Sequence, residues 1–98
     1  MAAFNIVRFR VKPGMDEVFL EAYRNGRAEW PGLKRGVIVR PEGRSYWLIG
    51  QWPDMKAITN ARPEMIATLD TFRHALEDLG PGFGVTDAVS GPVVLELK

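Results

Sequence analysis

Among the side chains that commonly do acid–base or nucleophilic chemistry, this 98-residue sequence has no cysteine and a single histidine. That histidine, His74, is the first candidate for a catalytic general base, because imidazole titrates near neutral pH. The apolar residues at positions 65, 66, 69, 72, 76 and 79 form one stripe of a predicted helix, and His74 lies roughly opposite that stripe. Its helical neighbours Asp70 and Asp78 favour a solvated, charge-paired histidine over a catalytic one.

Five other side chains are candidates for ligand binding: Asn5, Tyr23, Trp47, Trp52 and Arg73. Tyr23 and Arg73 lie at the margins of two helical stripes, where each either reaches a cavity or turns outward to water. The two tryptophans lie on opposite faces of one predicted strand, where they either fill core volume or form an aromatic wall for a flat ligand. Asn5 begins a strand, so its amide is either exposed at the end of the sheet or a hydrogen-bond donor in a pocket.

Composition and motifs exclude several classes of function. The sequence has no phosphate-binding glycine loop, no metal-ligand spacing and no nucleophilic triad, so we expect neither a cofactor nor a metal. A net charge of +1 without a basic stripe argues against nucleic acid. No apolar run approaches the about 18 residues of a membrane helix. The N-terminus lacks the basic and apolar regions of a signal peptide, and we therefore expect a cytoplasmic location.

The stretch Arg44–Trp52 is the clearest structural signal in the chain. Aromatic and branched residues lie there between the turn formers Pro41-Glu42-Gly43 and Pro53-Asp54. Because apolar side chains occur at both parities, the stretch predicts an interior strand covered on both faces. Gly50 weakens such a strand unless another group must approach its backbone closely. We expect that group to be an aromatic side chain of the core or a partner, or a flat ligand.

The remaining patterns alternate between strand and helix. The second helical pattern begins with Asp54 as an N-cap and contains a kink or a fresh start at Arg62-Pro63. Residues 83–91 read as a loop before the last strand. The predicted order is β-α-β-β-α-β, with strands over 4–12, 33–40, 44–52 and 92–97 and helices over 15–26 and 54–79.

This order predicts one α+β domain over residues 1–98 with a ferredoxin-like fold. In that fold the first and third strands lie in the middle of an antiparallel sheet, and both helices cover one face. The other face keeps large apolar groups, which a soluble monomer rarely exposes. A second copy packed sheet against sheet would cover them. We therefore expect a homodimer that forms a dimeric α/β barrel.

Three segments carry a resemblance to a known family: Val11–Met15, Trp47–Trp52 leading into Pro53-Asp54, and Gly91–Val94. They resemble proteins of the antibiotic-biosynthesis-monooxygenase type, in the ferredoxin-like dimeric barrel superfamily. The resemblance implies a cofactor-independent monooxygenase acting on a small aromatic or polyketide-like compound, held by an asparagine and a tryptophan. Asn5 falls near the region of that asparagine. Haem-degrading relatives carry a tryptophan on the second helix, and residues 58–79 contain none.

The alternative is a non-catalytic barrel of unknown function that binds a small ligand or responds to stress. In that case side chains would fill the interior. A large pocket with converging polar groups would favour the monooxygenase instead.

Overall fold

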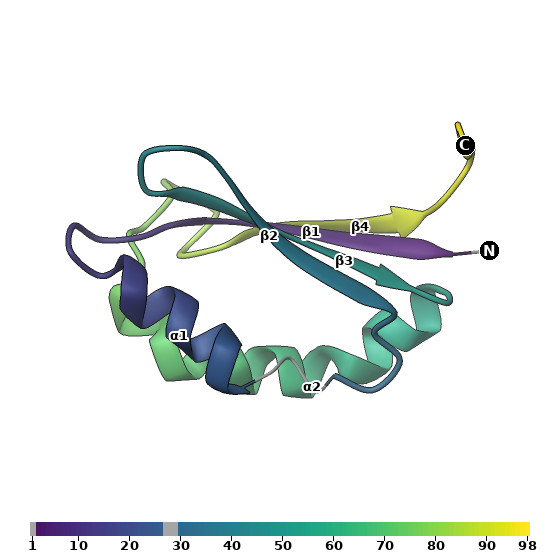
Figure 1. The fold of residues 1–98 in the computed structure, drawn as a ribbon, viewed down its shortest axis with the longest axis horizontal. Coiled ribbons are helices and arrows are strands. Elements are labelled where there is room, and N and C mark those ends of the chain that lie inside the picture. Colours follow the sequence, from purple (N-terminus) through teal and green to yellow (C-terminus); the bar gives the residue numbers. More distant parts are fainter. Residues whose placement is uncertain (1, 27–29) are drawn as a thin grey trace.

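The computed structural model describes residues 2–26 and 30–98. Its four-stranded antiparallel sheet has the order β2-β3-β1-β4, and both helices lie against one face of that sheet (Figure 1). The predicted ferredoxin-like α+β fold is confirmed, with the first and third strands in the middle. The elements are β1 (Ala3–Arg10), α1 (Asp16–Gly26), β2 (Arg35–Glu42), β3 (Ser45–Trp52), α2 (Met55–Phe72), the 3₁₀ helix η1 (Arg73–Ala75) and β4 (Asp87–Pro92).

Strand pairing fixes which side chains face the helices. Along β3, Tyr46, Leu48, Gly50 and Trp52 are buried and alternate with half-buried residues on the opposite face. Asn5 of β1 is paired with Gly50 on one side and with Ser90 of β4 on the other. Asn5 therefore lies mid-sheet on the face that the helices cover.

Two groups of aromatic rings fill the space between the sheet and the helices. The ring centroid of Phe19 lies 5.2 Å from that of Phe9 and 5.3 Å from that of Phe72. Nearer the start of α2, the Trp30 and Trp52 rings stack with centroids 6.3 Å apart and planes within 6°. Tyr23 joins the two groups, with its ring centroid 5.2 Å from that of Phe72 and 6.1 Å from that of Trp30.

The hairpin between β2 and β3 is tighter than the predicted turn at Pro41-Glu42-Gly43. Glu42 pairs with Ser45, so β2 extends to Glu42 instead of ending near residue 40. An irregularity between Val39 and Glu42 accommodates Pro41, which cannot donate a ladder hydrogen bond.

The second helix ends at Phe72, whereas the apolar period predicted a helix to residue 79. Leu76 instead forms a bridge with Val11, and the Glu77 N–H donates to the Arg10 carbonyl oxygen at 2.7 Å. The backbone beyond β1 needs hydrogen-bond partners, and this tertiary pairing overrides the helical pattern. Of the two alternatives predicted at Arg62-Pro63, a kink or a fresh start, the fresh start is wrong, because α2 runs through Pro63; Figure 1 shows that α2 is curved.

The last strand, β4, spans Asp87–Pro92, so the prediction of a loop over 83–91 and a strand over 92–97 is wrong. Pro92 pairs with Ala3 at the start of β1, and the Val93 N–H donates to the Ala2 carbonyl oxygen at 2.8 Å. Beyond this point β1 offers no further partner. The apolar alternation over 93–97 therefore continues past the end of the sheet, where Leu97 is 92% exposed (Figure 1).

Candidate functional site

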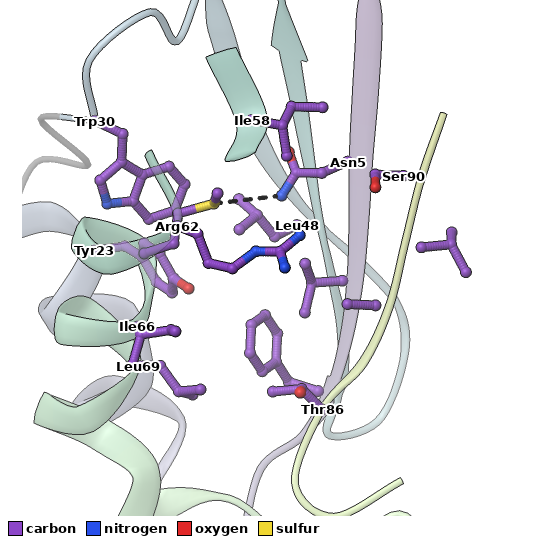
Figure 2. Close-up of a pocket in the computed structure, with 15 residues that line it drawn as sticks. Asn5, Tyr23, Trp30, Leu48, Ile58, Arg62, Ile66, Leu69, Thr86 and Ser90 are labelled. Carbon is purple, nitrogen blue, oxygen red and sulfur yellow. Dashed lines mark hydrogen bonds between the residues drawn. The ribbon is translucent and has the colours of Figure 1, made fainter. Parts of the chain in front are cut away.

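A cavity of about 390 Å³ lies between α2 and the helix-covered face of the sheet (Figure 2). This volume falls within the range of about 300–1,000 Å³ typical of small-molecule sites. Most of the lining is apolar and comes from β1, β3, β4 and α2. Polar groups enter it from Asn5, Tyr23, Arg62, Thr86 and Ser90.

The Asn5 side chain is fixed in one orientation. The Trp52 Nε1–H donates a hydrogen bond to Asn5 Oδ1 at 2.7 Å, and both residues are buried. Because an indole nitrogen only donates, the amide oxygen must face Trp52 and the amide nitrogen must face away. That nitrogen lies 3.7 Å from the Met65 sulfur, which is a weak acceptor (Figure 2). Asn5 thus presents a poorly satisfied N–H donor at the cavity.

Gly50 makes room for this Asn5–Trp52 pair. A Cβ atom built on Gly50 would clash with Asn5 Oδ1 and would lie 3.0 Å from Trp52 Nε1. The close approach that a glycine in mid-strand predicted is therefore made by the Trp52 indole and the Asn5 amide. Local sequence in β3 and the pairing of β3 with β1 together place the donor.

Tyr23 of α1 offers a second hydrogen-bond donor, its phenol hydroxyl group. Its ring packs edge-on against Phe19 and Trp30, with centroids 5.6 and 6.1 Å apart respectively. Burial raises the pKa of the Tyr23 phenol well above its usual value. Tyr23 therefore stays protonated and can donate a hydrogen bond, but it cannot serve as a base near neutral pH.

Arg62 brings a positive charge to the cavity. Figure 2 shows its side chain extending from α2 so that the guanidinium group lies among the lining residues. Within residues 2–26 and 30–98, no carboxylate forms an ion pair with it. The described lining contains no Asp, Glu or His. The described part of the lining therefore combines one cation with neutral donors and contains no conventional base.

The cavity brings together only some of the six residues selected from the sequence. Asn5 and Tyr23 line it, and Trp52 lies buried behind Asn5. Trp47 is half-buried on the opposite face of the sheet. Arg73 donates to Asp70 at 2.9 Å on the surface, and His74 is exposed in η1, outside the lining.

Two structural findings concern metals and membranes. In the part of the chain that the structure describes, no three His, Asp or Glu side chains gather where they could hold a metal ion. No helix of that part has the length and apolar character needed to cross a membrane.

Comparison with known proteins identifies the fold. No family model and no curated protein matches the sequence. A mutant of SnoaB, a cofactor-independent oxygenase from Streptomyces nogalater, matches with a TM-score of 0.75 and 19% identity, over 98% of this chain and 96% of SnoaB. A Bordetella bronchiseptica protein, provisionally assigned as an antibiotic biosynthesis monooxygenase, matches with a TM-score of 0.76 and 14% identity, over 96% and 98% of the two chains.

A conserved protein from Methanosarcina mazei Go1 matches with a TM-score of 0.77 and 10% identity, over 94% of this chain and 92% of its own. The chain has an antibiotic-biosynthesis-monooxygenase-like fold. At identities below 20% this likeness establishes the fold, and the function must be argued from the cavity.

Besides the hydroxyl groups of Thr86 and Ser90, sequence reasoning missed Arg62 and Trp30 as residues of the cavity. Arg62 lies four residues after Ile58 and four before Ile66, and both isoleucines line the cavity. Reading α2 as one continuous helix would have placed Arg62 on that face. Trp30 directly precedes Pro31 in the sequence, and no local pattern indicates that it stacks on Trp52.

Proposed function

We propose that the protein is a cofactor-independent monooxygenase acting on a small aromatic or polyketide-like compound. The observation that carries this proposal is the buried Asn5 amide, which Trp52 holds with its N–H groups toward an apolar cavity of about 390 Å³. The fold shared with SnoaB, which is named as a cofactor-independent oxygenase, supports it.

In such a reaction the substrate supplies the electrons and O₂ is the oxidant. An activated CH₂ group loses a proton to give an enolate, which passes one electron to O₂, and the two radicals recombine to form the C–O bond of a peroxide. The O–O bond then breaks as the second proton leaves the same carbon. The balance is R₂CH₂ + O₂ → R₂C=O + H₂O, so no cofactor is reduced or oxidised.

The residues of the cavity suit this chemistry. The Asn5 amide N–H donates to the oxygen on which the enolate charge develops, and the Tyr23 hydroxyl can add a second donor. Trp52 is a positioning residue, because it acts through the orientation of the Asn5 amide. The apolar lining excludes water and holds a flat ring in place.

We also propose that the active form is a homodimer packed through the open face of the sheet. The strand pairing places four apolar side chains in one row across this face, Val37, Ile49, Ile6 and Val89. Val89 is 60% exposed in a single chain. Arg8 on the same face is paired with Asp87 at 3.3 Å, so packing over the middle of the sheet would bury this arginine together with its counter-charge.

One observation favours a second candidate function, a non-catalytic barrel that binds a small ligand. No carboxylate or imidazole belongs to the described lining of the cavity, so the chain supplies no obvious group to take the first proton. In this case the Asn5 amide and the Tyr23 hydroxyl would recognise a ligand without changing it.

The test is O₂ consumption with a panel of anthrones and dihydroxynaphthalenes, with ¹⁸O₂ to follow label into the product. We expect turnover by the parent and a loss of about a hundredfold in kcat for Asn5→Leu, the size typical for removal of one oxyanion donor. The control is Asn60→Leu, because Asn60 is exposed on α2. Saturable binding without oxidation of any compound would favour the ligand-binding barrel, and absence of both would refute both functions.

A further inference from the structure

We propose that Arg62 makes the cavity selective for anions, so that the substrate enters it as a flat aromatic compound already carrying a negatively charged oxygen. An ionised enol, phenol or carboxylate has this chemistry. The inference deepens the proposed function and rests on it, because it names the substrate class of the same cavity.

Arg62 lies in a different environment from the four arginines that form ion pairs. Arg8, Arg24, Arg44 and Arg73 each form an ion pair with a carboxylate. The Arg62 guanidinium instead lies among the side chains that line the cavity (Figure 2), and no ion pair holds it within the described residues. Its neighbours one helical turn away are apolar, Ile58 and Ile66. Within residues 2–26 and 30–98 this charge has no carboxylate partner, and solvent or a ligand can supply one.

The polar groups of the cavity also lack a proton acceptor of suitable strength. Asn5 presents its N–H side, Tyr23 stays protonated, and the guanidinium group of Arg62 has no acceptor atom. Thr86 and Ser90 add only hydroxyl groups. A site with donors and a cation but without a base favours a ligand that has lost its proton in water before it binds. This property also resolves how an oxygenase could work here without a catalytic carboxylate.

Desolvation makes the charge selective. Arg62 is an exposed residue, so solvent can reach its side chain. A flat ligand that fills the cavity displaces part of this water. A neutral ligand would leave the cation with fewer partners, whereas an anionic oxygen replaces the lost water with a charge-assisted hydrogen bond. The cavity thereby both attracts anions and rejects their neutral analogues.

The experiment compares two flat ligands of nearly equal shape, a naphthalene carboxylate and the matching carboxamide, by isothermal titration calorimetry at neutral pH without O₂ turnover. We expect the parent to bind the carboxylate at least about tenfold more tightly, equivalent to about 1.4 kcal/mol. Arg62→Gln should abolish this preference, and Arg62→Lys should retain part of it. The matched control is Arg73→Gln, which removes an exposed arginine paired with Asp70 outside the cavity.

Equal affinities in the parent would overturn the inference, as would a preference that survives in Arg62→Gln or disappears equally in Arg73→Gln. Failure of the parent to bind either compound would overturn it as well. A failure of the inference about Arg62 can be distinguished from a failure of the monooxygenase proposal. An Arg62-dependent preference for anions without oxidation of any compound leaves the inference standing, whereas oxidation of a neutral substrate unaffected by Arg62→Gln leaves only the monooxygenase.

Discussion

Replacing Gly50 by alanine should break the hydrogen bond between Asn5 and Trp52. The added methyl group would clash with Asn5 Oδ1 and would lie 3.0 Å from Trp52 Nε1 and 3.4 Å from a Leu33 methyl group. Trp52 is fully buried and stacked on Trp30, so its indole cannot move aside without disturbing a second ring. We therefore expect the Asn5 amide to be the group that moves.

The expected loss of stability follows from two effects that destabilise the variant and one that stabilises it. Overpacking of a filled core costs about 1–3 kcal/mol. A broken buried hydrogen bond leaves an unsatisfied group that costs about 1–3 kcal/mol. The better strand conformation of alanine returns only about 0.5–1 kcal/mol. The net decrease in the free energy of unfolding should be about 2–4 kcal/mol, which for a chain of this size lowers Tm by about 10–20 °C.

Urea denaturation measures this difference, with Gly36→Ala as the control. Gly36 pairs directly with Gly50, and a Cβ there would meet Leu33 at an ordinary distance of 3.5 Å. We expect Gly36→Ala to be as stable as the parent or slightly more stable. If Gly50→Ala unfolds at the same urea concentration as Gly36→Ala, then Gly50 does not serve the Asn5–Trp52 pair and the reasoning is refuted.

Three further predictions concern other parts of the molecule. Burial raises the pKa of Tyr23, so the folded state holds this proton more tightly than the unfolded chain. The free energy of unfolding should therefore fall as pH rises above the usual phenol pKa of 10.0. Urea denaturation at alkaline pH should show a smaller decrease for Tyr23→Phe. His74→Ala should leave ligand affinity and Tm unchanged because His74 is exposed, and a loss of affinity by calorimetry would contradict its placement outside the site. Trp47→Glu should give a folded monomer by sedimentation equilibrium, whereas an unchanged dimer would move the interface away from the open face.

The sequence predicted the fold well because strong local patterns agreed with the tertiary structure. The strand Ser45–Trp52 is bounded by turn residues and apolar on both faces, and it lies in the interior of the sheet as expected. The second helix begins where Asp54 caps it, with the Ala57 N–H donating to Asp54 Oδ1 at 2.8 Å. Such signals depend on neighbours in sequence, and they can be read without knowing what packs against them.

The errors arose where distant pairing decides the structure. Leu76 continues the apolar period of α2 but pairs with Val11 instead, and no local residue signals that bridge. Residues 93–97 alternate as a strand should, yet β1 begins at Ala3, which already pairs with Pro92, so no residue of β1 lies opposite them. The cavity was harder to predict, because the orientation of its Asn5 donor depends on the hydrogen bond that Trp52 of β3 donates to Asn5 of β1. Arg62 was considered only as part of the predicted kink or fresh start at Arg62-Pro63, and not as a residue of the cavity.

The stacking of Trp30 on Trp52 gives the protein an optical signal of its own. Two indoles with centroids 6.3 Å apart are close enough for their electronic transitions to couple, which produces a paired band in circular dichroism. Trp30 also borders the cavity, so a bound ring would perturb that band. The third tryptophan, Trp47, lies on the opposite face of the sheet, where its emission responds to whatever covers that face. Circular dichroism and fluorescence thus report on two separate surfaces of one unlabelled molecule.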